Sequence, residues 1–267
     1  MDRILEPEIM DDRDADEAYA RADFSDSNQA FADRLGRALA RARAAAGALD
    51  AARTRDAAGA RDLTRARHPT GAHDPARARD GAHTRGDATW RIVDLGCGPA
   101  DVTIRIARAV PGSEVVAVDG SEEMLRLARE AVRAAGLSDR ITLHLGRVPG
   151  LELPERGFDA VVSKDMLHHL PDPHLLWSEV SRLARPGAIV QVMDLIRPAS
   201  LLEAREIVER VASREHPLLK EDFYHSLCAA FTIDEVRAQL RAAGLALTVE
   251  PAGDRHMVIE GVVGIGL

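Results

Sequence analysis

The sequence of 267 residues predicts an α/β protein with a doubly wound, Rossmann-like sheet of seven strands, mostly parallel, with an antiparallel C-terminal hairpin strand. Two observations carry this prediction. From Trp90 onward, short runs of β-branched and apolar residues alternate with segments rich in Ala, Leu, Arg and Glu, which is typical of a parallel sheet. The last two runs are separated by little more than Gly253 and Asp254, which is too short for a parallel crossover and predicts a hairpin.

The candidate strands follow one another as "RIVDLG", "EVVAVDG", "ITLHLG", "FDAVVS", "AIVQVMDL", "LALTVE" and "RHMVIEGVV". Several helices between them carry signals at their ends. Ser121 can cap a helix that stops at Gly136. Thr232 and Glu235 form the S/T-x-x-E capping box of a later helix, which Gly244 ends. These signals indicate that the alternation of strands and helices is real.

The stretch before Trp90 has a different composition. Residues 55–88 consist mostly of Ala, Arg, Gly, Asp, Thr and His, and they include Pro69 and Pro75. With almost no large apolar side chain, this segment cannot bury enough surface to offset the entropy of ordering it. The composition predicts a flexible insertion that serves as a solvated linker. A basic arm for an acidic partner is the alternative.

Overall composition narrows the class of protein. The net charge of −8 and the isoelectric point near 5.7 argue against a surface that binds nucleic acid or an anionic membrane. No apolar run reaches the roughly 18–20 residues that span a bilayer. Cys97 and Cys228 are too few for a disulfide framework, and no ligand spacing predicts a metal site. We therefore expect a cytoplasmic enzyme or binding protein without a metal.

The chemistry is indicated by "VDLGCGPADVTIRIA", a glycine-rich turn between the first strand and its helix. Gly96 and Gly98 let the backbone approach a ligand closely. The dinucleotide fingerprint G-x-G-x-x-G fails because Asp101 replaces its third glycine. Asp94, before the turn, would repel a diphosphate but suits an ammonium group, and Asp119 at the end of the second strand can accept both hydroxyls of a ribose. The predicted ligand has a ribose and a cationic head, without a diphosphate.

These residues resemble motif I, and the acid that follows it, in the class I S-adenosylmethionine-dependent methyltransferases. The resemblance includes "FDAVVSKDMLHHLPDP" and "RLARPGAIVQVMDL", and it implies a methyltransferase domain over residues 89–267 with a helical lid insertion around 198–231. The remaining pattern looks like a bacterial small-molecule branch, in which an N-terminal helical segment, here residues 1–54, closes over the site. Two departures are Ala100 in place of the motif's third glycine and Arg147 in place of an acid near the adenine.

The resemblance implies S-adenosylmethionine as the cofactor and assigns roles residue by residue. The cofactor-binding residues it implies are Asp94, Gly96, Cys97, Gly98, Asp119, Gly120, Met124, Arg147, Val148, Ser163 and Lys164. Since the Arg147 side chain cannot accept a hydrogen bond, the backbone of Arg147 and Val148 is expected to contact the adenine.

A protic acceptor must lose a proton during methyl transfer, and histidine is suited to removing it at neutral pH. The candidates, in order of preference, are His168, His256 and His169; any of them can instead be a structural histidine. Further substrate or lid candidates are Tyr19, Phe24, Asp194, Asp222, Tyr224, His225 and Arg255. The aromatic residues near the N-terminus can alternatively dock that segment on the core.

The expected activity is methyl transfer to an O, N, S or C atom of a small metabolite. A cofactor-binding accessory or regulatory subunit without catalysis is the alternative. A nucleic-acid acceptor is disfavoured, because "SKDM" replaces the Asn/Asp-Pro-Pro-aromatic motif of amino-methylating DNA enzymes. The sequence predicts no membrane association and no particular oligomeric state.

Overall fold

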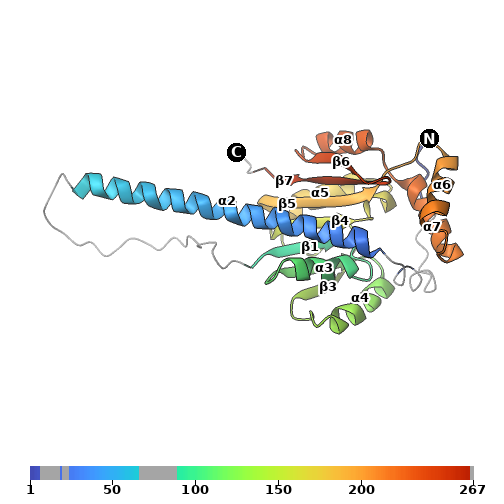
Figure 1. The fold of residues 1–267 in the computed structure, drawn as a ribbon, viewed down its shortest axis with the longest axis horizontal. Helices are drawn as coiled ribbons and strands as arrows, with labels where there is room; N and C mark the ends of the chain where they lie inside the picture. Colours follow the sequence, from blue (N-terminus) through green and yellow to red (C-terminus); the bar gives the residue numbers. More distant parts are fainter. Residues whose placement is uncertain (7–18, 20–23, 66–88, 265–267) are drawn as a thin grey trace.

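The computed structural model describes residues 1–6, 19, 24–65 and 89–264. In this part of the chain, seven strands form one sheet in the order β3-β2-β1-β4-β5-β7-β6 (Figure 1). The strands are β1 (Arg91–Leu95), β2 (Glu114–Asp119), β3 (Ile141–Leu145), β4 (Phe158–Lys164), β5 (Ala184–Leu195), β6 (Thr248–Ala252) and β7 (His256–Val262). The predicted fold class is confirmed.

Pairing within the sheet follows the predicted pattern. Strand β1 lies parallel to β2 and β4, and β4 lies parallel to β5. Every residue of β4 is buried, as expected for a central strand covered on both faces. Strand β7 runs antiparallel to both β5 and β6, so the C-terminal hairpin is also confirmed. The parallel strands end at one edge, where the first residues of their loops come together.

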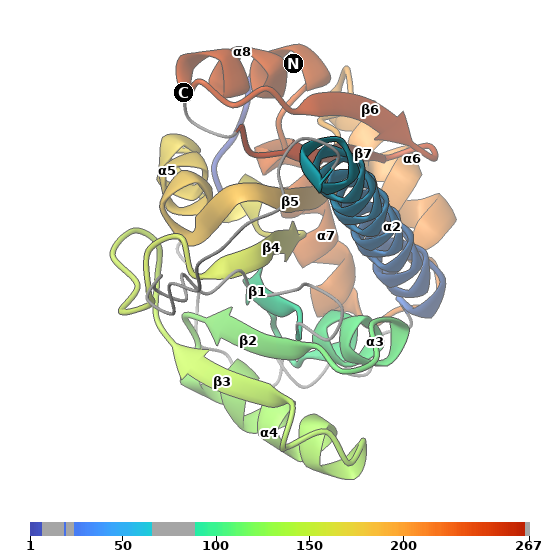
Figure 2. The same ribbon diagram turned by 90° about the vertical axis from the view of Figure 1, so that its left-hand side faces the viewer.

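Helices cover both faces of the sheet. They are α2 (Ser25–Arg65), α3 (Asp101–Ala109), α4 (Glu122–Ala134), η1 (Leu167–His169, a 3₁₀ turn), α5 (His174–Leu183), α6 (Leu201–Val211), α7 (Pro217–Ala229) and α8 (Ile233–Ala242). One apolar cluster joins the sheet to α2, α3 and α4, and a second joins it to α5 and α8. Figure 2 shows α5 on one side of the sheet and α2 and α3 on the other. No helix in the described ranges is long and apolar enough to cross a membrane.

The predicted helix signals are present. The hydroxyl of Ser121 accepts a hydrogen bond from the backbone N–H of Met124 at 3.2 Å. Thr232 and Glu235 form the reciprocal capping box. Both caps satisfy backbone donors that the first turn of a helix leaves unpaired.

Helix α2 corrects the expected boundary of the insertion. It continues through residues 55–65, which the sequence analysis assigned to the flexible segment. Ala and Arg are strong helix formers, and the first proline after the helix begins is Pro69, so nothing in the sequence stops the helix earlier. The rest of the expected insertion, residues 66–88, lies outside the described residues.

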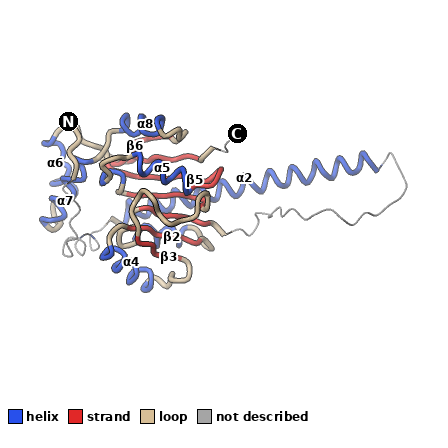
Figure 3. The backbone as a smooth tube through the Cα atoms, turned by 180° about the vertical axis from the view of Figure 1, so that it is seen from behind, coloured by secondary structure: helices blue, strands red, loops and turns tan. Residues whose placement is uncertain are grey.

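The first turns of α2 belong to the core. Phe31, Leu35 and Leu39 are fully or almost fully buried, and the side chain of Gln191 on β5 donates a hydrogen bond to the backbone carbonyl of Phe31 at 2.9 Å. Phe31 therefore docks the helix on the sheet, as the structural alternative proposed. The far half of α2 projects from the end of the sheet opposite α6 and α7 (Figure 3).

Helices α6 and α7 occupy the stretch in which the lid insertion is expected, and they share their own apolar cluster. Residues 1–6 lie against this pair. The N-terminal amine of Met1 donates to the carbonyl of Ala199 at 2.9 Å, and the N–H of Ile4 donates to the carbonyl of Cys228 at 3.0 Å. The start of the chain is thus bound next to the carboxyl edge of the sheet.

Candidate functional site

The glycine-rich turn after β1 is fastened to the neighbouring strand. The backbone N–H groups of Gly96 and Cys97 both donate to the carbonyl of Val118 at 2.9 Å. Gly96 has φ of +75°, and a Cβ built on it would lie 2.7 Å from the side chain of Met166. Glycine is required here by both backbone conformation and space. Ala100, at the expected third glycine, tolerates φ of +68° and precedes α3.

Asp94 lies in the buried end of β1, beside this turn. Its carboxylate accepts a hydrogen bond from the hydroxyl of Thr103 at 2.6 Å. Burial, with a smaller contribution from the charge of Asp119, raises the pKa of Asp94 to about 6, although the Thr103 hydrogen bond and the charge of Lys164 act in the opposite direction. A desolvated carboxylate of this kind is stabilised by a cationic ligand.

Asp119 ends β2 and joins two backbone segments. One carboxylate oxygen accepts from the N–H of Gly98 at 2.8 Å and the other from the N–H of Ser121 at 2.9 Å. The half-buried carboxylate is thereby fixed between the glycine-rich turn and the start of α4. Each of its oxygens keeps further capacity to accept a hydrogen bond.

The other predicted cofactor residues lie at this edge or next to it, but some of their side chains have other partners. Ser163 donates to the carbonyl of Leu95 at 2.8 Å, so its hydroxyl ties β4 to β1. The ammonium of Lys164 pairs with Asp165. Burial raises the pKa of Cys97, which keeps its thiol protonated.

Around the second strand, the space expected for the adenine is bounded by loops. A Cβ on Gly120 would lie 2.8 Å from the side chain of Arg147, whose Nε atom is 3.4 Å from the carbonyl oxygen of Gly120. Val148 packs at the margin of the apolar cluster below α5, and the N–H of Met124 is taken by its cap.

Two aromatic lid candidates lie at the cofactor turn. An atom of the Tyr19 ring is 3.9 Å from the Cβ position of Gly98, and the rings of Tyr19 and Phe24 are 5.1 Å apart. Tyr19 therefore lies at the glycine-rich turn, whereas residues 1–6 contact the α6–α7 pair.

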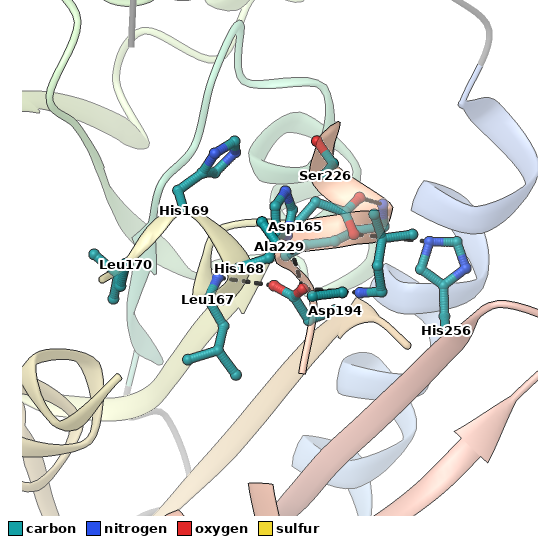
Figure 4. Close-up of polar contacts among 12 residues, drawn as sticks. Asp165, Leu167, His168, His169, Leu170, Asp194, Ser226, Ala229 and His256 are labelled. Atoms are coloured by element: carbon teal, nitrogen blue, oxygen red, sulfur yellow. Dashed lines mark hydrogen bonds and ion pairs between the residues drawn. The ribbon is translucent and has the colours of Figure 1, made fainter. Parts of the chain in front are cut away.

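His168 and Asp194 form a buried pair at the same edge (Figure 4). Nδ1 of His168 lies 2.7 Å from a carboxylate oxygen of Asp194, which also accepts from the N–H of Leu195 at 2.8 Å; the second oxygen accepts from the N–H of Leu167 at 2.7 Å. Burial alone would lower the pKa of His168, but the adjacent Asp194 outweighs it, with help from Glu6 and Asp165, and the pKa rises to about 9. Asp194 thus orients the ring and strengthens it as a base.

His169 makes a different set of contacts. Its Nδ1 atom pairs with the carboxylate of Glu6, and its ring is 4.1 Å from the ring of His168. The other oxygen of Glu6 accepts from the hydroxyl of Ser226 on α7 at 2.7 Å and lies 3.9 Å from Nε2 of His168. Burial would raise the pKa of Glu6, but the hydrogen bond and charge of His169 lower it to about 2.

His256, at the start of β7, faces Asp165 rather than the His168 pair. Its Nε2 atom lies 3.7 Å from the Oδ1 atom of Asp165, and that oxygen is buried without a hydrogen-bond partner in the described structure. Burial lowers the pKa of His256, although the charge of Asp165 partly compensates. The three candidate histidines are therefore not equivalent.

Two predicted lid residues of α7, Tyr224 and His225, have ring contacts of their own. Tyr224 lies under the guanidinium of Arg205 at 4.7 Å, and its ring is 5.8 Å from that of His225. Asp222 is exposed, and Arg255 binds the neighbouring Asp254 at 3.0 Å. On the same helix it is Ser226 that reaches Glu6.

Sequence reasoning missed Arg3, Glu6, Asp165 and Ser226. Arg3 donates to the carbonyls of His168 and Leu170 at 2.8 and 2.9 Å, which holds the N-terminal segment over η1. No local signal marked Glu6, because its partners are more than 160 residues away. Asp165 could have been found, since it directly follows the predicted strand and Lys164.

The geometry defines a Rossmann-like domain with a cofactor turn and a His–Asp pair at one sheet edge. Residues 92–187 match the family model described as a methyltransferase domain. An uncharacterised methyltransferase of Mycobacterium bovis is 31% identical over 57% of this chain and 76% of its own length. The 27-O-demethylrifamycin SV methyltransferase of Amycolatopsis mediterranei is 29% identical over 58% of this chain and 53% of its own.

A crystal structure of a methyltransferase from Aquifex aeolicus shares the fold, with a TM-score of 0.51 and 20% identity over 65% of this chain and 82% of that one. The chain spans about half or less of the length of the first curated relatives it matches. It belongs to the class I S-adenosylmethionine-dependent methyltransferase family.

Proposed function

We propose that this protein transfers the methyl group of S-adenosylmethionine to a small-molecule acceptor, at an oxygen, nitrogen, sulfur or carbon atom, and that His168 removes the acceptor's proton where it has one. The observation that carries the proposal is the buried His168–Asp194 pair at the same sheet edge as Asp94 and Asp119. In a parallel sheet of this kind, ligands bind at that edge.

The cofactor side fits this ligand by its chemistry. Asp94 and Asp119 place two carboxylates on either side of the glycine-rich turn, and burial of Asp94 favours a positively charged partner. We assign the ammonium group of the methionine moiety to Asp94 and the ribose hydroxyls to Asp119. The tight turn at Gly96 lets backbone groups lie close to the ligand. When bound, the sulfonium supplies an electrophilic methyl group that a nucleophile can displace.

The acceptor side supplies proton removal. Asp194 is fixed by the N–H groups of Leu167 and Leu195, so it holds His168 through Nδ1 without adjustment. Nε2 of His168 accepts the acceptor's proton when the ring is neutral, and Asp194 stabilises the imidazolium that forms. Because the pKa of His168 is raised to about 9, the neutral fraction increases as the pH rises toward that value, and methyl transfer to a protic acceptor is expected to increase with it. The remaining rate enhancement is expected to come from orientation, because an in-line displacement on a good leaving group depends mainly on alignment.

A small acceptor is supported by two observations. The net charge of −8 disfavours a polyanionic acceptor. The relative from Amycolatopsis is named for an O-methylation of rifamycin, a small molecule, although that assignment concerns the relative alone. We assign to residues 1–6, Tyr19 and the α6–α7 pair the role of covering the acceptor.

The direct test is transfer of a labelled methyl group. The protein is incubated with methyl-labelled S-adenosylmethionine and a fractionated extract of bacterial metabolites, and label is sought in small molecules and in macromolecules. Label in a small molecule, lost in the His168→Ala variant, supports the proposal. Label in nucleic acid or protein overturns the small acceptor. Cofactor binding with no transfer to any fraction supports the accessory subunit instead.

A further inference from the structure

Three potential metal ligands converge beside the His168–Asp194 pair, and we call Glu6, His168 and His169 the His-Glu cluster. One ligand atom from each residue lies within 4.8 Å of the others. Two members come from η1 and the third from the N-terminal segment. The sequence predicts no metal site, because it contains no H-x-x-x-H, cysteine pair or acid cluster with enough ligands.

His168 and Glu6 each have a further hydrogen-bond partner outside the cluster. Asp194 binds Nδ1 of His168 at 2.7 Å, and Nε2 of the same ring lies 3.9 Å from Oε1 of Glu6. The hydroxyl of Ser226 donates at 2.7 Å to Oε1 of Glu6, the oxygen that lies nearer to His168. A carboxylate behind a histidine is the usual outer shell of a metal-bound imidazole, because it fixes the ring and raises its basicity. This support requires no rearrangement of Asp194.

The separations suit a shared ion. Nε2 of His168 and the nearer Glu6 oxygen are 3.9 Å apart, beyond hydrogen-bond range. Two ligands that each lie roughly 2.0–2.2 Å from one ion are at most about 4.4 Å apart, and about 3.3–3.6 Å apart in tetrahedral geometry, so a small closure of this pair brings both atoms onto one ion. His169 already contacts Glu6, and its side chain is 36% exposed, so its ring has room to turn toward a common centre.

We propose that the His-Glu cluster binds a divalent transition-metal ion of the Zn²⁺ class. Two imidazoles and one carboxylate are ligands that Zn²⁺ and similar ions favour, whereas Mg²⁺ and Ca²⁺ prefer oxygen ligands alone. The carboxylates of Glu6 and Asp194 offset the charge of the ion. Three protein ligands leave a position open for water or another small ligand.

The ion has a consequence for the activity. It takes the lone pair of Nε2 on His168, which the proposed base needs for the acceptor's proton. It also joins the N-terminal segment to η1 through Glu6. Metal loading is therefore expected to inhibit methyl transfer reversibly. This consequence rests on the proposed function, whereas binding of the ion does not.

Co²⁺ is the probe for the test, because its visible absorption reports four-coordinate binding. The full chain, without a polyhistidine tag and freed of metal by a chelator, is titrated with Co²⁺ in the absence of cofactor and acceptor. We expect one equivalent to bind with an intense visible band that Zn²⁺ abolishes by displacement. Glu6→Gln and His169→Ala should each weaken Co²⁺ binding by at least about 10-fold, the lower limit reported for loss of outer-shell support alone.

The matched control is His174→Ala, which removes an exposed histidine five positions after His169 in the sequence and outside the cluster. Its Co²⁺ affinity should stay within about two-fold of the parent, and thermal melting should show that all three variants are folded. No band, or a band that both cluster variants retain, overturns the metal site and leaves the cluster as an ion pair. Because this titration involves no methyl transfer, its failure is distinct from a failure of the proposed function.

Discussion

The cofactor side and the acceptor side of the site lie at the same sheet edge but are built from contacts of very different range. The backbone of Gly98 binds Asp119, 21 residues away in the sequence. On the acceptor side, Glu6 binds His169 across 163 residues and Ser226 across 220. The first side is built mainly by successive strand–turn–helix units, and the second exists only when both ends of the chain have folded together.

The largest expected effect is the loss of turnover in a variant that changes the acceptor side alone. His168→Ala should lower kcat by about 10²–10⁴-fold, since it removes the proposed general base. Affinity for S-adenosylhomocysteine should stay within a few-fold, because His168 belongs to the acceptor side. Methyl-transfer kinetics and calorimetry check the two halves of this prediction. A joint loss of cofactor affinity and thermal stability would contradict the separation and make His168 structural.

The stability of the protein should be sensitive to added side-chain volume in the glycine-rich turn. Gly96→Ala combines a positive φ with a methyl group placed 2.7 Å from Met166. We expect it to lower the free energy of unfolding by roughly 2–5 kcal/mol, the sum of the backbone and overpacking costs. Gly112→Ala is the matched control, with φ of +78° and nothing within 4 Å, and should cost only about 1–2 kcal/mol. Urea denaturation measures the free energy of unfolding of both variants, and equal losses would show that the Met166 side chain moves aside at no cost.

Asp119→Ala tests the ribose assignment. Loss of charge-assisted hydrogen bonds should cost roughly 1.5–3 kcal/mol, or about 10–150-fold in affinity for S-adenosylhomocysteine. Calorimetry measures the change, and Asp139→Ala, at an exposed position after α4, provides the control. Undiminished affinity in the Asp119 variant would remove the ribose from this position.

The smallest expected effect is a pH dependence of cofactor affinity that arises from Asp94. The pKa of Asp94 is raised to about 6, so its carboxylate is mostly charged at pH 7 and mostly neutral at pH 5. If it binds the ammonium group, affinity for S-adenosylhomocysteine should fall by roughly 10-fold between these values. Asp94→Asn should bind weakly at both pH values; a variant that retains the full slope would assign it to another group.

The two sides also differ in how far the sequence predicted them. The mostly parallel sheet, the hairpin and the caps at Ser121 and Thr232 follow from patterns within one or two elements, and the structure confirms them. The candidates Asp94 and Asp119 lie together for the same reason. His168 and Asp194 were each singled out, but their pairing depends on adjacent β4 and β5 and could not be derived from spacing.

Glu6 illustrates what the sequence could not supply. It lies in an acidic N-terminal stretch where nothing distinguishes it from its neighbours, and its position depends on Arg3 and on the carbonyls beneath that side chain. Helix α2 shows the opposite limit. The scarcity of large apolar residues beyond residue 54 predicts a flexible segment, yet strong helix propensity continues the helix to Arg65.

The path of the chain around α2 has a consequence for redesign. Ala42 and Trp90 both pack against the same apolar cluster, and the guanidinium of Arg43 lies 5.7 Å from the centre of the Trp90 ring. The chain thus departs from the core and rejoins it at nearly one point, while the described helix beyond residue 43 extends for roughly 33 Å at 1.5 Å per residue. The segment between residues 44 and 89 is therefore a suitable insertion site, and we expect that a reporter domain, an affinity module or a shorter linker can replace it. The entropic cost of closing such a connection grows only slowly with its length, so the replacement should change the free energy of unfolding of the rest of the protein very little.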